Sequence, residues 1–351
     1  MEATPVAPGE DERGAIELLR SVFPRDPSLL RYEDEYPLAF APRNRAFRRV
    51  VRAGGRVVSH AAALPARQKA GAIEMPVGFI GSVATAPDHR GRGAAAAAVR
   101  ACEEALADEA GAVLAMLWSS EAAFYEKQGY FPAGTEIRVT LPADLDPEAR
   151  LDAEPLAERD LEAVREIHAR EESLTHREAE DERRLFAIYG TRAFVSRRGG
   201  RAVAYAVVGR GADFPDHVHE WGGSDEDAAR LIGGVAGLHR GRSLTVLVPA
   251  FREAVASRLA RLGGAREVHP LGLAKCLRPG TLAALVNRMW RETGISFRAE
   301  SSEECGVEVV RGDGGRLRLS TAAFVRAVVG PAGRPLPGLP VPFFVWGMDS
   351  I

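Results

Sequence analysis

The feature that most constrains this chain is a glycine-containing loop between a long β-type run and an alanine-rich stretch. Ile73–Ala84 is rich in strand-forming residues, although Pro76 and Gly78 are expected to break the run. The loop 86–93 (APDHRGRG) follows, and Ala94–Ala110 then leads to a glycine. Alanine is the best helix former, and glycine suits the left-handed residue just past a helix end. The sequence therefore predicts a strand, a glycine loop and a helix in that order.

The loop residues Arg90-Gly91-Arg92-Gly93 have the composition of an anion site. Glycine lets the backbone approach a ligand closely and adopt positive φ. Several N–H groups at a helix start then point the same way, and the helix dipole adds positive potential. The pattern predicts a phosphate or pyrophosphate site, and a tight turn without a ligand is the alternative. A dinucleotide fold is disfavoured because two other strands precede this one, and no Gly-Lys-Ser/Thr follows as in a Walker loop.

Two further blocks flank the Arg-x-x-Gly-x-Ala pattern: Val83–Pro87 (VATAP) before it, and residues 124–130 (FYEKQGY) after it. In combination they resemble the GCN5-related N-acetyltransferase (GNAT) superfamily over the first 140 residues. The resemblance implies acetyl-CoA as co-substrate, with its pyrophosphate on residues 91–96. It also implies that Val83, Ala84 and Thr85 offer backbone groups to the pantetheine and the thioester carbonyl.

Tyr125 lies in the second of these blocks and is the candidate general acid. An acceptor amine has a pKa of about 10, so a base must remove its proton before or during attack on the thioester. The leaving thiolate needs a proton, which a phenol can supply. The resemblance places Tyr125 near the thioester sulfur, and a core tyrosine at a helix end is the alternative.

The element pattern of the first segment recurs further along the chain, although its residues do not. A proline-containing, acidic stretch, 142–155, is expected to be a linker. We therefore predict three domains, 1–145, 146–278 and 279–351, with Ile137–Leu141 closing the first and Leu271–Cys276 closing the second. The tail ends in an apolar run, so it is expected to pack into the body of the protein rather than to fray.

This layout resembles the enhanced intracellular survival (Eis)-type acetyltransferases. The resemblance implies an α/β (α+β) chain with two tandem GNAT-like domains, the second degenerate, whose mixed, mainly antiparallel sheets are splayed, and then a small segment like sterol carrier protein. Ser119-Ser120-Glu121 also resembles that family, where a Ser-Glu pair lies at the cofactor. The implied cofactor-binding residues are Val83, Ala84, Thr85, Arg90, Gly91, Arg92, Gly93, Ala94, Ala95, Ala96, Ser120 and Glu121.

The base is the less defined part of the site. Many GNAT members carry a glutamate on the strand before the loop, and here the stretch 80–82 (IGS) has no carboxylate. The Eis-type resemblance implies that the free C-terminal carboxylate, here that of Ile351, serves as base. Asp349, Glu74 and a water relay are the rivals.

Composition excludes several other classes. Of 351 residues, 46% are hydrophobic and 27% charged, which excludes a disordered chain. The three cysteines (Cys102, Cys276 and Cys305) form no Cys-x-x-Cys, which argues for a reducing compartment and against a thiolate metal site. No apolar run approaches the roughly 20 residues of a membrane span, and the N-terminus is too acidic for a signal peptide. We expect a cytoplasmic protein that does not bind a membrane.

Three questions stay open at this level. His217 and His219 have the spacing of metal ligands on a strand, but a pair on a sheet face is favoured and no metal is expected. The acceptor is a small-molecule or peptide amine of unknown identity, and the resemblance suggests a homo-oligomer. The alternative functions are a non-catalytic acyl-CoA-binding regulatory module and aminoacyl transfer from tRNA. The formal charge of −2 weighs against the last, and no nucleic-acid partner is expected.

Overall fold

The computed structural model describes residues 2–24, 31–143, 145, 153–239, 241–304, 306–331 and 336–351. The chain divides into two compact units. Unit 1 combines Met1–Gly134, Gly272–Val341 and Ser350–Ile351, and unit 2 combines Thr135–Leu271 and Pro342–Asp349. Each unit therefore joins parts of the chain that are far apart in the sequence. Most of the predicted linker 142–155 lies outside the described residues, and the three-domain division of the sequence stays a prediction.

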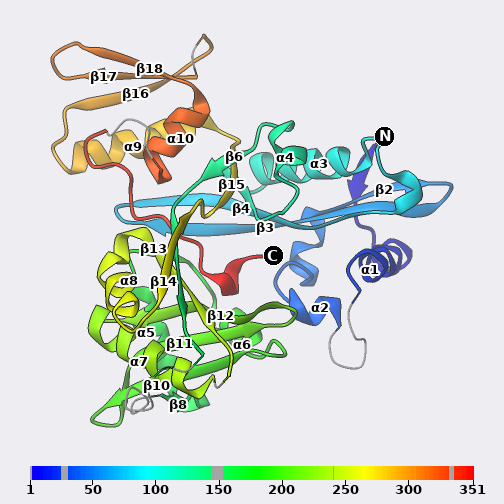
Figure 1. Ribbon diagram of the computed structural model, residues 1–351. Helices are drawn as coiled ribbons and strands as arrows, with labels where there is room; N and C mark the ends of the chain where they lie inside the picture. The colour runs from blue at the N-terminus through cyan, green and yellow to red at the C-terminus, as the bar shows by residue number, and fades with distance from the viewer. Residues whose placement is uncertain are drawn as a thin grey trace. The chain divides into compact units, whose positions relative to one another are not determined.

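Unit 1 holds the N-terminal elements and the C-terminal helices (Figure 1). Its helices and strands are β1 (Ala3–Pro5), α1 (Glu10–Val22), α2 (Tyr32–Glu35), β2 (Arg48–Ala53), β3 (Arg56–Ala70), β4 (Ile73–Thr85), α3 (Ala94–Asp108), β5 (Leu114–Leu117), α4 (Ala122–Glu126), β6 (Phe131–Ala133), β15 (Gly272–Cys276), α9 (Pro279–Glu292), β16 (Phe297–Ser302), β17 (Gly306–Arg311), β18 (Arg316–Leu319) and α10 (Thr321–Val329).

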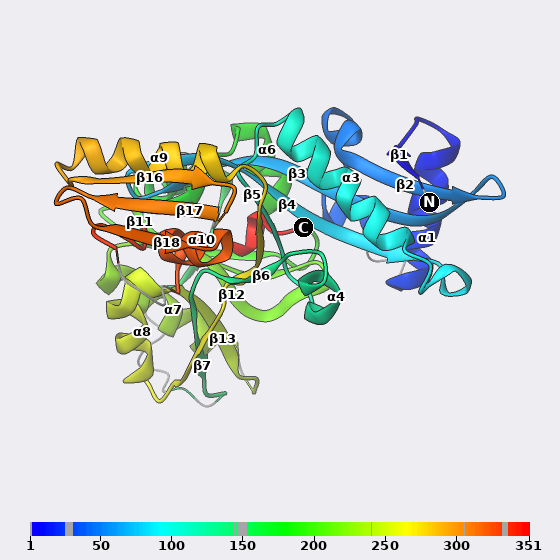
Figure 2. The same ribbon diagram turned by 90° about the horizontal axis from the view of Figure 1, so that it is seen from above.

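The main sheet of unit 1 has the order β1-β2-β3-β4-β5-β15-β6. Every neighbouring pair is antiparallel except β4 and β5, which are parallel. Helix α3 packs along β3 and β4, as Figure 2 shows. Its apolar face repeats at helical spacing and is buried in the core, through Ala98, Val99, Cys102 and Leu106. The sheet is thus mixed and mainly antiparallel, as predicted.

Strand β4 is continuous, so the predicted break at Pro76 and Gly78 was wrong. Glycine at position 78 is explained by packing: a Cβ there would lie 2.3 Å from Cδ1 of Leu106 on α3. The glycine therefore lets the helix lie close to the strand rather than ending it. Pro76 still takes part in the backbone hydrogen bonding of the sheet, because its carbonyl oxygen accepts from the Val113 N–H at 2.8 Å.

A second, smaller sheet in unit 1 has the order β16-β17-β18, and α9 and α10 cover one of its faces (Figure 1). Strand β17 contacts both helices, and its side chains Val307 and Val309 are buried, as are Val286, Trp290 and Phe324 of the helices. The likeness of this segment to sterol carrier protein stays a prediction.

Unit 2 consists of β7 (Glu136–Leu141), β8 (Glu154–Pro155), α5 (Leu161–Ala169), β9 (Ser173–Thr175), α6 (Ala179–Phe186), β10 (Arg192–Arg198), β11 (Arg201–Arg210), β12 (Asp213–Gly223), α7 (Asp225–Leu238), β13 (Leu244–Pro249), α8 (Glu253–Ala260) and β14 (Ala265–His269), with a short helical turn, Gly347–Asp349, near the chain end. Its sheet has the order β14-β7-β13-β12-β11-β10-β8. The single parallel pair is β12 and β13, which repeats the β4–β5 arrangement of unit 1.

Two strands lie in sheets other than those predicted. Strand β7 had been expected to close the first sheet, but it pairs with β13 and β14 in unit 2. Strand β15 had been expected to close the second sheet, but it pairs with β5 and β6 in unit 1. Both sheets need an antiparallel strand at the same place, and a strand's own pattern does not specify which of two equivalent edges it joins. None of the described helices is long and apolar enough to cross a membrane.

Candidate active site

A pocket of about 810 Å³ opens in unit 1 where β4 ends and α3 begins. It is bounded by the end of α1, the loop after β4, the first turn of α3 and the region of α4. The lining residues are Val22, Phe23, Val83, Thr85, His89, Arg90, Gly91, Gly93, Ala94, Ala95, Ala96, Ser119, Ser120, Glu121, Phe124 and Tyr125. This volume fits within the range of pockets that bind small molecules and cofactors.

Strands β4 and β5 separate beside this pocket. Their parallel pairing joins residues 77–79 to residues 114–116 and goes no further. Strand β4 then continues alone on that edge from Ile80 to Thr85. Backbone groups on an unpaired edge can bind a ligand in extended form, as a neighbouring strand would. The sequence-based expectation of a splayed sheet is met here.

The loop after β4 has the geometry of an anion site. Gly91 and Gly93 have φ of 71° and 82°, and Gly93 is the left-handed N-cap of α3. No side chain caps α3, so its first N–H groups are not occupied by a capping oxygen. A Cβ at either glycine would have no heavy atom within 4 Å, so both face open space. Arg90 folds back, and its Nε donates to the Thr85 carbonyl at 3.3 Å.

Most of the predicted cofactor-binding residues line this one pocket, and two do not. Ala84 points into the core and is only 2% exposed, because alternate residues of a strand face opposite sides. Arg92 is exposed and is not part of the lining. The residues that sequence reasoning missed are Val22, Phe23, His89, Ser119 and Phe124. The apolar end of α1 was the available signal for Val22 and Phe23.

Tyr125 sits on α4 in the wall of the pocket and is 7% exposed. Its ring packs edge-on against Phe124 and Tyr130, with centroids 4.9 and 5.7 Å away. Burial, helped by the nearby Glu121 carboxylate, raises the pKa of Tyr125 to about 12. The phenol therefore keeps its proton at neutral pH and can act as a proton donor.

The chain terminus lies against β4. A Cβ built on Gly81 would be 2.2 Å from the Ile351 carboxyl oxygen and 2.4 Å from its carbon. Only glycine leaves room for the terminus at this place, and the Ile351 side chain packs against the core of unit 1. The terminal carboxylate is thus two residues along the strand from Val83, which lines the pocket.

Glu74, one of the rival bases, does not lie near the pocket. It is near the start of β4, and the seven residues from Gly81 to Glu74 span roughly 23 Å of extended strand. Its Oε2 is paired with Arg67 at 3.0 Å on the exposed surface. Glu74 is therefore a partly exposed strand residue that is paired with Arg67, away from the pocket.

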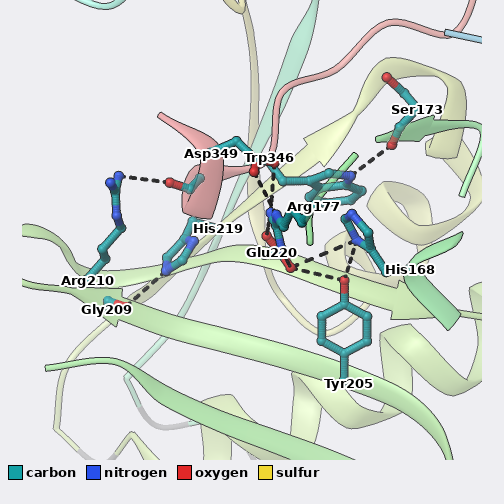
Figure 3. Close-up of polar contacts among 11 residues, drawn as sticks. His168, Ser173, Arg177, Tyr205, Gly209, Arg210, His219, Glu220, Trp346 and Asp349 are labelled. Atoms are coloured by element: carbon teal, nitrogen blue, oxygen red, sulfur yellow. Dashed lines mark hydrogen bonds and ion pairs between the residues drawn. The ribbon is translucent and has the colours of Figure 1, made fainter. Parts of the chain in front are cut away.

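Asp349, the other rival base, is held in a buried ion network of unit 2 (Figure 3). Arg177 donates from Nε and Nη2 to the two Asp349 oxygens at 2.6 and 2.7 Å. The same guanidinium donates to both Glu220 oxygens at 2.9 and 2.6 Å. Both carboxylates are almost wholly buried, so neither is placed as a solvent-accessible base.

The Arg177 ion network continues within unit 2 through two further side chains, Tyr205 and His168. The Tyr205 hydroxyl donates to Glu220 at 3.2 Å and lies 2.9 Å from Nδ1 of His168 (Figure 3). Burial alone would raise the pKa of Glu220, but the Arg177 guanidinium outweighs burial and holds that pKa below its usual range. Glu220 therefore stays ionised and is paired with Arg177 in the interior of unit 2.

The last residues of unit 2 are fixed at several further points. Ser173 exchanges hydrogen bonds with the Phe344 backbone at 2.9 and 2.8 Å, and its carbonyl accepts from the Trp346 indole at 2.9 Å. Arg210 donates to the Gly347 carbonyl at 3.0 Å. The predicted packing of the apolar tail is thus observed for Phe344 and Trp346, which are fully buried.

Replacing Arg177 by Met should lower the free energy of unfolding by about 3–5 kcal/mol, because two buried carboxylates would lose their counter-ion. Chemical denaturation of the full chain measures this loss. The matched control is Arg266→Met, since Arg266 makes a similar bidentate pair with Glu253 on the surface of the same unit. An exposed pair contributes at most about 1 kcal/mol. Equal losses for the two variants would contradict this account of the network.

The histidines of β12 make contacts within unit 2. Nε2 of His219 is hydrogen-bonded to the Gly209 carbonyl at 3.0 Å, and burial lowers the pKa of His219 to about 4. His217 packs edge-on against the Phe214 ring. In the described part of the chain, no group of three or more His, Cys, Asp or Glu side chains could hold a metal ion.

Unit 2 lacks the anion site of unit 1 at the equivalent place. Helix α7 follows β12 directly, and its N-cap Ser224 accepts the Asp227 N–H through its own side chain. The first turn of α7 carries Asp225, Glu226 and Asp227. A capped and acidic helix start repels a pyrophosphate, so only unit 1 has this binding geometry among the described residues.

Residues 6–133 match the acetyltransferase (GNAT) domain family. No curated protein matches the chain. It is similar to the crystal structure of a GCN5-related N-acetyltransferase from Anabaena variabilis, with a TM-score of 0.69 and 15% identity over 93% of this chain and 89% of that one. It is also similar to one from Kribbella flavida (TM-score 0.62, 16% identity, 95% and 85% covered) and to Eis1 from Mycobacterium abscessus (0.61, 14%, 96% and 95%). Residues 6–133 therefore match a GNAT acetyltransferase domain, and the chain has the fold of these solved GNAT structures.

Proposed function

We propose that this protein transfers an acetyl group from acetyl-CoA to an amine in the pocket of unit 1. The observation that carries the proposal is the junction of β4 and α3. There, an uncapped helix start with two left-handed glycines and an unpaired strand edge border the same pocket as a buried, protonated tyrosine.

The residues present fit the acetyl donor. The pyrophosphate is anionic, and the first N–H groups of α3, with Gly91 and Gly93 leaving open space beside them, suit it. The pantetheine arm is extended and carries amide groups, and the unpaired edge of β4 at Val83–Thr85 offers these groups backbone partners. The thioester would then lie toward Tyr125, which stands in the same pocket wall.

In the proposed reaction, the amine nitrogen attacks the thioester carbon and the carbon–sulfur bond breaks. The amine gives up one proton, which the Ile351 carboxylate accepts. The CoA thiolate takes one proton, which the Tyr125 phenol donates. The proton held on Ile351 restores Tyr125 through solvent, so acetyl amide and CoA thiol are the balanced products. The closeness of the terminus to Gly81 on β4 supports Ile351 as base.

Replacing Gly93 by Ala should raise the dissociation constant of acetyl-CoA by about tenfold or more, the value of one lost hydrogen bond to a charged group. The added methyl would stand in the open space beside the start of α3. Gly54→Ala is the matched control, because Gly54 also has positive φ (56°) and empty surroundings, but lies in the turn between β2 and β3. Calorimetric titration of both variants measures the effect. A similar loss of affinity in both would show that general backbone strain, and not the loop, is responsible.

A non-catalytic acyl-CoA-binding module is the second candidate. It is favoured by one observation, that Glu121 is the single carboxylate among the residues that line the pocket. Mass spectrometry of a panel of amines after incubation with acetyl-CoA separates the two candidates. An N-acetylated amine supports the enzyme, whereas tight binding of acetyl-CoA with no acetylated product supports the binding module.

A further inference from the structure

Strand β4 has an irregular backbone beside the pocket. Its pairing with β3 shifts between His60 and Ala62, so that Ser82 and Val83 of β4 together face one residue of the partner strand. Ser82 has a φ of 52°, a left-handed conformation that residues with a side chain rarely adopt. A bulge of this kind turns backbone groups away from the ladder and toward a new direction.

His60 holds the bulge from the interior of unit 1. Its Nδ1 lies 2.9 Å from the Ser82 carbonyl oxygen, and the side chain is completely buried. A carbonyl only accepts hydrogen bonds, so Nδ1 must carry the proton. Burial lowers the pKa of His60 to about 4, which keeps the ring neutral. In the described part of the chain, Nε2 has no hydrogen-bond partner, so the bond to Ser82 is the polar contact that the ring makes.

Aromatic residues fix both His60 and Ser82. The Phe40 ring stacks on the His60 ring, with centroids 6.0 Å apart and planes 21° apart. The Tyr32 hydroxyl lies 3.1 Å from the Ser82 hydroxyl, and the Tyr32 ring packs edge-on against Phe40. Ser82 is thus held through its carbonyl by one side chain and through its hydroxyl by another.

The peptide plane links this contact to the pocket. In a trans peptide, the carbonyl of Ser82 and the N–H of Val83 point in opposite directions. Because the carbonyl points at the buried His60, the Val83 N–H points to the other side of the strand. Val83 lines the pocket, and no β5 residue pairs with it.

We infer that His60 is a positioning residue for acetyl transfer: by fixing the Ser82–Val83 peptide, it aims the Val83 N–H at the carbonyl oxygen of the acetyl thioester. The inference rests on the proposed function for the place of the thioester. As the amine adds, that oxygen gains negative charge, and a fixed N–H donor stabilises it without any proton leaving the nitrogen. His60 itself touches neither substrate.

The first test compares the binding of acetyl-CoA and S-ethyl-CoA, which differ in one carbonyl oxygen. The wild type should bind acetyl-CoA about 5–10-fold more tightly, as one added hydrogen bond implies. His60→Leu should remove this preference. The smaller His60→Asn, whose amide nitrogen takes the place of Nδ1, should retain it. His60→Phe is a second variant without a donor, and it replaces His60→Leu in this test if that variant does not fold. Its ring can still stack on Phe40.

The second test is turnover. His60→Leu should lower kcat by about 10–100-fold with the KM for acetyl-CoA unchanged, and His60→Asn should restore most of it, because loss of an aimed donor acts on the transition state. Gln68→Met is the control: Gln68 is equally buried on the same strand and donates to the Lys69 carbonyl at 3.2 Å. It should lower the melting temperature but leave kcat near the wild-type value.

The outcomes separate this inference from the proposed function. An unchanged preference for acetyl-CoA over S-ethyl-CoA in both donor-free variants would overturn the role of His60. Equal losses of kcat in His60→Leu, His60→Asn and Gln68→Met would do the same, since they would mark a structural role alone. A wild type that binds both ligands but acetylates no amine would defeat the proposed function, and the binding preference would still decide the role of His60.

Discussion

Tyr125→Phe should lower kcat for acetyl transfer by about 10²–10³-fold, the usual contribution of a positioned general acid. The affinity for acetyl-CoA should stay near the wild-type value, because the variant keeps the ring and its packing against Phe124 and Tyr130. The expected loss lies in the step in which the thiolate leaves, since no other phenol lines the pocket in the described residues. Stopped assays of CoA thiol release and calorimetric titration of acetyl-CoA measure the two quantities.

Tyr130→Phe is the matched control for this variant. Tyr130 packs against Tyr125 and is equally buried, but it does not line the pocket. Its hydroxyl can be removed without changing the lining, so kcat should change by no more than a few-fold. Turnover by Tyr125→Phe that equals turnover by Tyr130→Phe would remove Tyr125 from the mechanism.

The acid should also leave a signature in the pH dependence. Because burial and Glu121 raise the pKa of Tyr125 to about 12, the phenol stays protonated between pH 6 and 9. Its proton is lost only as the pH rises through its folded-state pKa. The fall of kcat that results from deprotonation of Tyr125 should therefore begin only at strongly alkaline pH. Any rise of kcat across the neutral range reports the deprotonation of the amine or of the base.

Adding one glycine after Ile351 should lower kcat by about 10²-fold or more, because the carboxylate would move by about 3.5 Å, the length of one residue, from the place where it lies against Gly81. The close approach at Gly81 leaves no space for a longer chain to pass without displacement. The binding of acetyl-CoA at the start of α3 should be unchanged, because Ile351 is not among the described residues that line the pocket.

Two variants control the extension. Ile351→Leu keeps both the length of the chain and its terminal carboxylate, so it should retain most activity. Gly81→Ala leaves the carboxylate in place chemically, but its Cβ would lie 2.2 Å from the Ile351 oxygen and so would push the terminus away. It should reproduce the loss caused by the extension. Full activity in both the extended chain and Gly81→Ala would exclude Ile351 as the base.

The local elements could be predicted from the sequence where a residue's own chemistry decides the structure. Helices α7 (Asp225–Leu238) and α10 (Thr321–Val329) begin directly after a serine N-cap, which is the residue type that favours a helix start. The anion loop could be recognised for the same reason, because Gly91 and Gly93 tolerate left-handed backbone that other residues resist.

The other features of the fold and the site depend on contacts with residues far away in the sequence, which the local sequence does not reveal. Gly78 had the appearance of a strand break, and only the position of Leu106 on α3 shows why glycine is needed there. The exchange of β7 and β15 between the sheets is seen only in the strand pairing, because the pattern of either strand would fit both sheets. The role that we infer for His60 could not be predicted, because it depends on a contact with one carbonyl of the neighbouring strand, that of Ser82.

The most direct test of the central claim is release of CoA thiol from acetyl-CoA, measured against a panel of amines with the wild type, Tyr125→Phe and the chain extended after Ile351. We expect amine-dependent thiol release by the wild type and its loss in both variants. If the wild type and the extended chain both release thiol and Tyr125→Phe does not, the protein is still an acetyltransferase, but the base is a group other than Ile351. An absence of amine-dependent release by the wild type, despite tight binding of acetyl-CoA, would contradict the claim that the pocket of unit 1 catalyses acetyl transfer.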